Sequence, residues 1–229
     1  MQKSILTIGD NLFKIVSLRE KWVYLRFQIL LKFRTLKIVN NTMLADTKLF
    51  EYSKKAVINY KQIPERINFL LSMVENSVRS RDQKILIIGP RYESEIYGLY
   101  GLGFKRSNIL AIDSISYSKK IIVGDMHNTT FPDNSFDLVI AGWVLAYSKN
   151  HQKAMNEIFR IIKNNGLVII SGDISDYQFP IDFSKIHIQD SNISIESLCS
   201  NFEIFQLTLG KTCWNSNSNI MCLALKANK

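Results

Sequence analysis

Cysteine is scarce in this sequence, and the few cysteines do not form a recognisable framework. They are odd in number and contain no Cys-x-x-Cys spacing; they are Cys199, Cys213 and Cys222. Such a set argues against a disulfide scaffold and against a cysteine-based zinc site, since both need paired thiols. Reduced thiols in a cytoplasmic protein are expected, and no metal site is predicted.

Long hydrophobic runs are also missing. No stretch approaches the roughly 20 apolar residues that cross a bilayer as a helix, and the first ten residues lack the apolar centre of a signal peptide. Hydrophobic residues nevertheless make up 46% of the 229 positions, which supports a packed core and argues against global disorder. One cytoplasmic α/β domain with an appendage is therefore expected.

Acidic residues are too few in the first third of the chain to balance the basic ones. Residues 1–84 contain 16 Lys and Arg against 7 Asp and Glu, whereas residues 85–229 contain 13 of each kind. The whole net charge of +9 therefore belongs to the N-terminal part. This asymmetry predicts a boundary near residue 82, with a basic, mainly helical extension over 1–82 and the main domain over 83–229.

The most unusual part of the extension is residues 14–37, KIVSLREKWVYLRFQILLKFRTLK, which contain seven basic residues and one acid. Apolar residues occur nearly all round a helical projection, but good helix formers dominate and favour a helix. Three interpretations stay open: a packed cap with solvated lysines, a basic surface against anionic lipid or a partner, and nucleic-acid binding. Basic charge alone is a weak argument for nucleic-acid binding. The second would add a peripheral position at a membrane.

From Lys84 onwards, short β-branched runs alternate with segments of helical pattern. Runs that are apolar at successive positions are typical of strands buried on both faces of a parallel sheet. The connection between residues 112 and 121 is too short for a full helix, so that crossover must be abbreviated. The expected parallel strands cover 85–88, 109–112, 121–123, 138–140 and 167–170.

Helices are predicted between these strands and ahead of them. They cover 63–78, 92–102 and 151–162, and Asn165-Gly166 is expected to stop the last one. Residues 203–209 and 220–225 flank a turn-rich connection that is typical of a hairpin. The sequence therefore predicts a doubly wound, mostly parallel sheet with an antiparallel edge.

Ligands of such a sheet bind beyond the carboxyl ends of the strands, where the strand order reverses. Asp113 ends the second strand, 24 residues beyond Gly89. A carboxylate there accepts two hydrogen bonds from a ribose diol and repels a 2′-phosphate, although an Asp that caps the following turn is the alternative. Asp125 and Met126, after the third strand, would supply an acceptor for an exocyclic amine and a polarizable side chain for a purine ring.

The segment GDMHNTTFPDNSFDLVIAGWVLAYSKNHQKAMNEIFRIIKNNGLVIISGD resembles class I S-adenosylmethionine-dependent methyltransferases, especially the broad small-molecule group. The resemblance covers roughly residues 84–173, and its specificity comes from the order and spacing of several short pieces. Those pieces are Gly124-Asp125, the run from Phe131 to Asp137, Val144-Leu145, the run from Glu157 to Lys163, and Gly166-Leu167.

The resemblance implies a fold, a cofactor and residue roles. The fold would be a seven-stranded Rossmann-like sheet, and the cofactor S-adenosylmethionine. Asp113 would bind the ribose, Asp125 and Met126 the adenine, and Ala141 and Gly142 would approach the methionine part. Glu157, Arg160 and Lys163 match the family pattern but are assigned to packing and surface pairing.

The first loop, GPRYESE, departs from the family pattern. Aligned on Gly89, the chain has Arg91 and Glu93 where members usually have two further glycines. The cofactor would then be held differently, with Glu93 or Glu95 facing its cationic group and Arg91 near its carboxylate. The alternatives are a degenerate site and another ligand; a dinucleotide is disfavoured, because the Gly-x-Gly-x-x-Gly pattern fails.

The sequence therefore predicts an enzyme that transfers a methyl group from S-adenosylmethionine to a small-molecule or a glycan- or lipid-linked acceptor. The competing interpretation is an inactive methyltransferase-like binding module. No catalytic base stands out, because positioning and desolvation can carry most of an in-line methyl transfer. His127 lies beside the expected pocket and is the one candidate for accepting a proton from an acceptor hydroxyl.

Overall fold

The structure is a computed structural model of the 229-residue chain. It describes residues 11–33, 37–38, 51, 54–55, 57–60, 63–175, 183–188, 194–211 and 219–229. Cys213, which is predicted to be a reduced thiol, lies outside these residues. Of the other two cysteines, Cys199 and Cys222 are buried and free.

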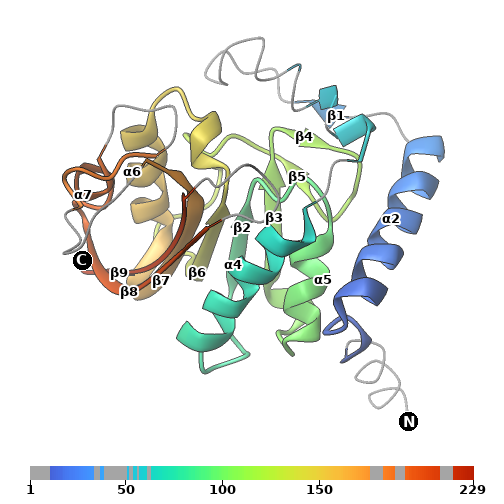
Figure 1. The fold of residues 1–229 in the computed structure, drawn as a ribbon, viewed down its shortest axis with the longest axis horizontal. Helices are drawn as coiled ribbons and strands as arrows, with labels where there is room; N and C mark the ends of the chain where they lie inside the picture. Colours follow the sequence, from blue (N-terminus) through green and yellow to red (C-terminus); the bar gives the residue numbers. More distant parts are fainter. Residues whose placement is uncertain are drawn as a thin grey trace.

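A seven-stranded sheet forms the centre of the molecule, in the order β5-β3-β2-β6-β7-β9-β8 (Figure 1). Neighbours from β5 to β7 are parallel, and β9 is antiparallel to both β7 and β8. The predicted doubly wound sheet with an antiparallel edge is thereby confirmed. The strands are β2 (Ile85–Ile88), β3 (Ile109–Asp113), β5 (Ile122–Val123), β6 (Phe136–Gly142), β7 (Ile162–Ile174), β8 (Phe202–Lys211) and β9 (Asn219–Ala227). A separate two-stranded sheet joins β1 (Lys37–Ile38) to β4 (Ile115–Ser116).

Strand β2 shows why the central runs have no polar position. Its four side chains alternate between two hydrophobic clusters: Ile85 and Ile87 face one, and Leu86 and Ile88 face the other. All four are buried, since helices cover both faces of the sheet. Burial of each such side chain stabilises the fold by about 1.5–3 kcal/mol.

Helices from both halves of the chain cover the sheet (Figure 1). The first cluster includes buried side chains of α2 (Val16–Phe33), α4 (Pro64–Ser77) and α5 (Ser94–Gly101). The second includes those of α6 (His151–Ile161) and the short α7 (Ile195–Leu198). The helices predicted over 63–78, 92–102 and 151–162 are confirmed within a few residues. Among the described residues, every helix falls short of the length and apolar character needed to cross a bilayer.

The start of β7 corrects one prediction. Asn165-Gly166 does not stop α6, because the helix already ends at Ile161 and the strand begins at Ile162. Ile162 pairs with Phe136, the pairing resumes in register at Leu167, and a shift lies between the two. Asn165 takes a φ of 59° in this irregular segment. The local turn signal therefore marks an irregularity inside a long strand.

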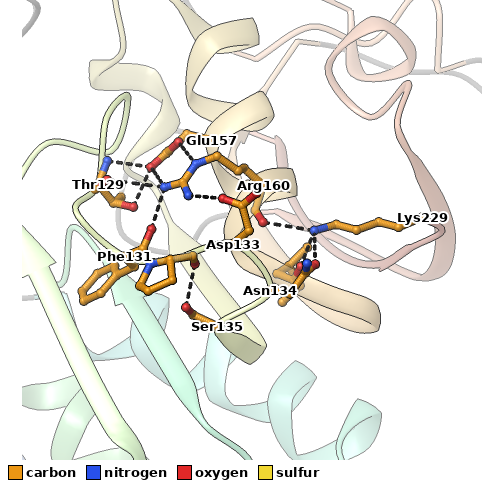
Figure 2. Close-up of polar contacts among 10 residues, drawn as sticks. Thr129, Phe131, Asp133, Asn134, Ser135, Glu157, Arg160 and Lys229 are labelled. Atoms are coloured by element: carbon orange, nitrogen blue, oxygen red, sulfur yellow. Dashed lines mark hydrogen bonds and ion pairs between the residues drawn. The ribbon is translucent and has the colours of Figure 1, made fainter.

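Arg160 on α6 holds the segment that leads into β6 (Figure 2). Its guanidinium donates to both carboxylate oxygens of Glu157 at 2.8 Å and to the carbonyl oxygen of Phe131 at 2.8 Å. It also donates to the Asp133 carboxylate. The buried Glu157 in turn accepts from the backbone N–H of Thr129 at 2.7 Å and from its hydroxyl at 2.6 Å. The packing role predicted for Glu157 and Arg160 agrees with this geometry.

The two carboxylates around Arg160 are expected to differ in their effect on stability. Glu157→Gln should lower the free energy of unfolding by about 2 kcal/mol, because hydrogen bonds to a buried charged group are lost. Asp133→Asn should change it by less than about 0.5 kcal/mol, since that pair is exposed. Urea denaturation of both variants measures the difference, and equal effects would contradict it.

The same carboxylate gives a pH dependence. Burial alone would raise the pKa of Glu157, but hydrogen bonds from Arg160 and Thr129 outweigh it and hold the pKa below 4.5. The stabilisation is therefore complete above pH 4.5 and is lost as the pH falls through the lower, folded-state pKa. In Glu157→Gln this part of the acid-induced loss of stability should be missing.

Candidate functional site

A cavity opens at the carboxyl ends of β2, β3, β5 and β6, where the strand order reverses. Its empty volume is about 1090 Å³, which includes the solvent-filled space at its opening. Residues after each of these strands line it, and helix α4 and residues 57 and 63 close it on another side. This is the position at which open α/β sheets bind their ligands.

Gly89 directly follows β2 and lines the cavity. Its φ is +70°, and its N–H donates to the carbonyl oxygen of Ile112 at 2.8 Å. A Cβ at this position would lie 2.3 Å from Cγ2 of Val144, which also lines the cavity. Both the backbone conformation and the close approach therefore require glycine here.

Arg91 takes the left-handed backbone conformation without being a glycine, at a φ of 44°. Its N–H donates to Oδ2 of Asp113 at 3.0 Å, and its guanidinium donates to the hydroxyl of Tyr147 at 3.2 Å. Both side chains line the cavity. The loop therefore keeps a left-handed turn at one of the positions where the family usually has glycine, and it places a cation there.

Asp113 lines the cavity and also caps the turn that follows it. Besides the Arg91 N–H, it accepts from the N–H of Ile115 and the hydroxyl of Ser114, both at 3.2 Å. Burial raises its pKa in spite of these bonds. A carboxylate has about four acceptor sites, so capping leaves capacity for a ligand hydroxyl.

The structure separates the two glutamates of the first loop. Glu93 is fully buried and does not line the cavity; it forms an ion pair with Arg26 of α2, in which Nε and Oε2 lie 2.6 Å apart. Its carboxylate also accepts from the Ser118 hydroxyl. The prediction that Glu93 faces a ligand is therefore corrected, because Arg26 already neutralises it on the other side of the loop.

Glu95 is the glutamate that lines the cavity. Its Oε2 is buried and has no hydrogen-bond partner among the described residues. Burial raises its pKa to about 8. At neutral pH the apo protein therefore keeps a largely protonated carboxyl at the cavity wall, and a cation placed beside it would favour ionisation.

Glu95 should make the ligand-free protein less stable as the pH rises. Its pKa is near 4.5 in the unfolded chain and about 8 in the folded one, so between these values the folded state binds the extra proton. Stability should then fall from about pH 4.5 to about pH 8 and become level above it. Thermal unfolding from pH 6 to pH 9 should show this slope in the native protein and a smaller one in Glu95→Gln.

The other predicted site residues fall into two groups. Met126 lines the cavity, and so does Gly142, whereas Ala141 is fully buried and does not line it. Asp125 is turned away: its Oδ1 accepts from the N–H of His127 at 2.9 Å and lies 2.6 Å from Nδ1 of that ring. The cofactor roles assigned to these residues stay predictions.

The prediction that His127 is a candidate catalytic base is corrected. Its ring is buried and outside the cavity, with Nδ1 against Asp125 and Nε2 2.6 Å from the Ser148 hydroxyl. Both ring nitrogens are thus occupied in the core. Proximity in sequence to Met126 placed the histidine near the site, but the turn after β5 directs it inward.

Sequence reasoning missed the contribution of the N-terminal third to the cavity. Arg66 and Leu70 of α4 line it, and the Arg66 guanidinium lies 5.1 Å from the ring centroid of Trp143, another lining residue. Arg66 also forms an ion pair with Asp173 at 3.1 Å. The apolar stripe of α4 predicted only packing; the arginine beside it was the signal for a second role. The domain boundary at residue 82 stays a prediction. Residues on both sides of that boundary line the cavity.

Comparison with known sequences gives matches to methyltransferases. Residues 104–170 match the family described as "Methyltransferase domain". A demethylmenaquinone methyltransferase from a Geobacillus species is 31% identical over 88 residues, which cover 36% of this chain and 35% of that protein. The chain thus matches about a third of the length of this relative.

Solved structures show the same fold at low sequence identity. A protein from Pyrococcus horikoshii has a TM-score of 0.57 at 17% identity, over 78% of this chain and 99% of that one. The N-methyltransferase NodS from Bradyrhizobium japonicum, solved with S-adenosyl-L-homocysteine, has 0.56 at 12% identity, over 79% and 98%. A SAM-dependent methyltransferase from Methanosarcina mazei has 0.54 at 15% identity, over 68% and 97%.

Proposed function

Since the chain has the fold of class I S-adenosylmethionine-dependent methyltransferases and residues 104–170 match a methyltransferase domain, we propose that it transfers a methyl group from S-adenosylmethionine. The acceptor would be a small molecule or a glycan- or lipid-linked group. The observation that carries the proposal is the cavity at the strand-order reversal, which Gly89, Asp113 and Met126 reach from three different strands.

The lining of the cavity fits such a cofactor. Asp113 has remaining acceptor capacity for a ribose hydroxyl, and Met126 offers a polarizable side chain for a purine. At the first loop, Glu95 and Arg91 match in sign the ammonium and the carboxylate of a methionine group. The unpartnered Oε2 of Glu95 is the observation that most supports a cationic ligand.

The residues of the chain position the reactants and exclude water. A bound S-adenosylmethionine supplies an activated methyl group on a cationic sulfur. Trp143 and Tyr147 would place the acceptor, and α4 closes the cavity beside them. In-line displacement needs this alignment more than it needs a base, in agreement with the inward position of His127.

Calorimetry with S-adenosylmethionine and S-adenosylhomocysteine tests the proposal. We expect binding of both with Kd values in the micromolar range and, at pH 7, proton release when the cationic S-adenosylmethionine binds and Glu95 ionises. The released proton makes the observed heat depend on the ionisation enthalpy of the buffer, and Glu95→Gln should reduce that dependence. If millimolar cofactor produced no binding heat and no thermal shift, the proposed function would be refuted.

A further inference from the structure

Helix α2 is fixed to the domain by one of its faces. Val23 and Phe27 are fully buried on that face. The buried Arg19 donates to Oδ1 of Asn68 on α4 at 2.6 Å, and Arg26 forms the buried ion pair with Glu93. These attachments set the rotation of the helix, so its opposite side faces outward.

That outward side is also apolar. It carries a row of large side chains at spacings of three and four residues, which places them along one face of a helix. We name this row the outer stripe; it consists of Leu18 (42% exposed), Trp22 (41%), Leu25 (52%), Ile29 (49%) and Phe33 (75%). Contiguous exposed apolar surface of this kind marks an interaction site rather than ordinary surface.

Basic residues accompany the outer stripe. Lys21 and Lys32 are exposed and lie to one side of it on the helical projection, and the exposed Lys14 lies in the turn just before the helix. The one acidic residue of the helix, Glu20, is turned inward, where it accepts from the Ser94 hydroxyl at 2.8 Å and pairs with Arg19. Among the described residues, the outward surface of α2 is therefore basic and apolar and has no acid.

The positive surface continues beyond the helix onto its neighbour. Trp22 of the outer stripe contacts Tyr97 of α5, with ring centroids 6.4 Å apart. Lys120 lies over the rings of Tyr97 and Tyr100, and Arg106 lies over Tyr100 at 4.9 Å. Cations thus extend the charged area past the edge of the apolar row.

This chemistry selects one partner. A second copy docked through the same surface would bring lysines against lysines with no carboxylate to neutralise them. A nucleic acid would satisfy the charges but could not bury Leu25 or Ile29. A bilayer with anionic headgroups satisfies both requirements, because apolar side chains enter its boundary and lysines meet the headgroups.

We propose that α2 docks on an anionic lipid surface through the outer stripe and its flanking lysines. The proposal is independent of methyl transfer, since it concerns only where the protein lies. Flotation of the full chain with vesicles tests it directly. Phosphatidylcholine vesicles with 30% phosphatidylglycerol, about a third of the lipid, should bind the protein, and pure phosphatidylcholine vesicles should bind it much less.

Two double variants separate the apolar from the electrostatic part. Lys21→Ala with Lys32→Ala should weaken binding roughly tenfold or more, since each lysine near an anionic surface contributes severalfold. Leu25→Ser with Ile29→Ser should also weaken it at least tenfold, because two large side chains no longer enter the lipid boundary. All four positions are exposed, so folding is retained.

Matched controls use exposed residues elsewhere. Lys149→Ala with Lys185→Ala removes the same charge, and Phe205→Ser removes an apolar side chain that is 56% exposed on β8. Neither should change vesicle binding. Equal binding of all variants, or equal binding to neutral vesicles, would overturn the proposal. So would a dimer in sedimentation experiments that Leu25→Ser with Ile29→Ser dissociates, which would assign the surface to a second copy.

Discussion

Gly89→Ala is expected to lower the free energy of unfolding by about 3 kcal/mol, the largest effect of a single added methyl group at the site. Two causes add up. The φ of +70° costs an L-residue about 1–2 kcal/mol, and the new Cβ would lie 2.3 Å from Cγ2 of Val144, which forces a displacement at the end of β6. Urea denaturation measures the total.

Gly103 supplies the control, because it has a φ of +88° but nothing within 4 Å of an added Cβ. Gly103→Ala should therefore show the backbone cost alone, about 1 kcal/mol. Combining Gly89→Ala with Val144→Ala should restore part of the stability, since the closest contact, with Cγ2 at 2.3 Å, is removed, whereas the contact with the Val144 Cβ at 2.7 Å and the backbone strain remain. Equal losses in Gly89→Ala and Gly103→Ala would show that the approach to Val144 does not matter.

Asp113→Asn is expected to weaken binding of S-adenosylmethionine roughly 10- to 100-fold. A hydrogen bond from a ribose hydroxyl to the acceptor site that turn capping leaves open on this charged group contributes about 1.5–3 kcal/mol, and an amide replaces at most part of that. S-adenosylhomocysteine has the same ribose and should lose affinity by the same factor. Calorimetry on both ligands measures it.

Asp133→Asn is the matched control for this second prediction. It makes the same chemical change at an exposed carboxylate that does not line the cavity, and it should leave cofactor affinity unchanged. Retained thermal stability in Asp113→Asn would separate lost binding from lost folding, since the carboxylate also caps its turn. Unchanged affinity in a folded Asp113→Asn protein would exclude Asp113 from the ribose site.

The parts of the fold that could be predicted from the sequence depend on local patterns. The bounds of strand β2 are predictable because a short run of four apolar residues that ends at Gly89 is typical of a strand buried on both faces of a sheet. Asn165-Gly166 gives the wrong end for α6 because a non-local pairing, and not a local pattern, sets the boundary. The pair is a strong local turn signal, but the partner that sets the strand boundary is Phe136, which is far away in the sequence.

The candidate site shows the same limit at the level of single side chains. Glu93 and Glu95 are equally acidic in the sequence, and their positions in the loop do not reveal which one faces the cavity. Arg26 decides this, because it lies 67 residues before Glu93 and neutralises it from the other side. A pairing over that distance leaves no local pattern.

The sequence pattern of helix α2 is ambiguous for a related reason. Apolar residues occur all round it, because one face packs on the domain and the other carries the outer stripe. A periodicity argument assumes one buried face, so two apolar faces cancel in the pattern. The absence of a single apolar face on α2 is therefore the sequence signal for a second apolar surface, the outer stripe.

The strand order has a consequence for how the chain folds. Strand β9 lies between β7 and β8, so β8 joins the sheet only through a strand that follows it in the chain. Until β9 is in place, the edge of β7 stays open to incorrect pairing. The β8–β9 hairpin can form early because its contacts are local, and it would then dock onto β7 as one unit. The edge of β7 is therefore a position at which aggregation competes with folding until the hairpin docks.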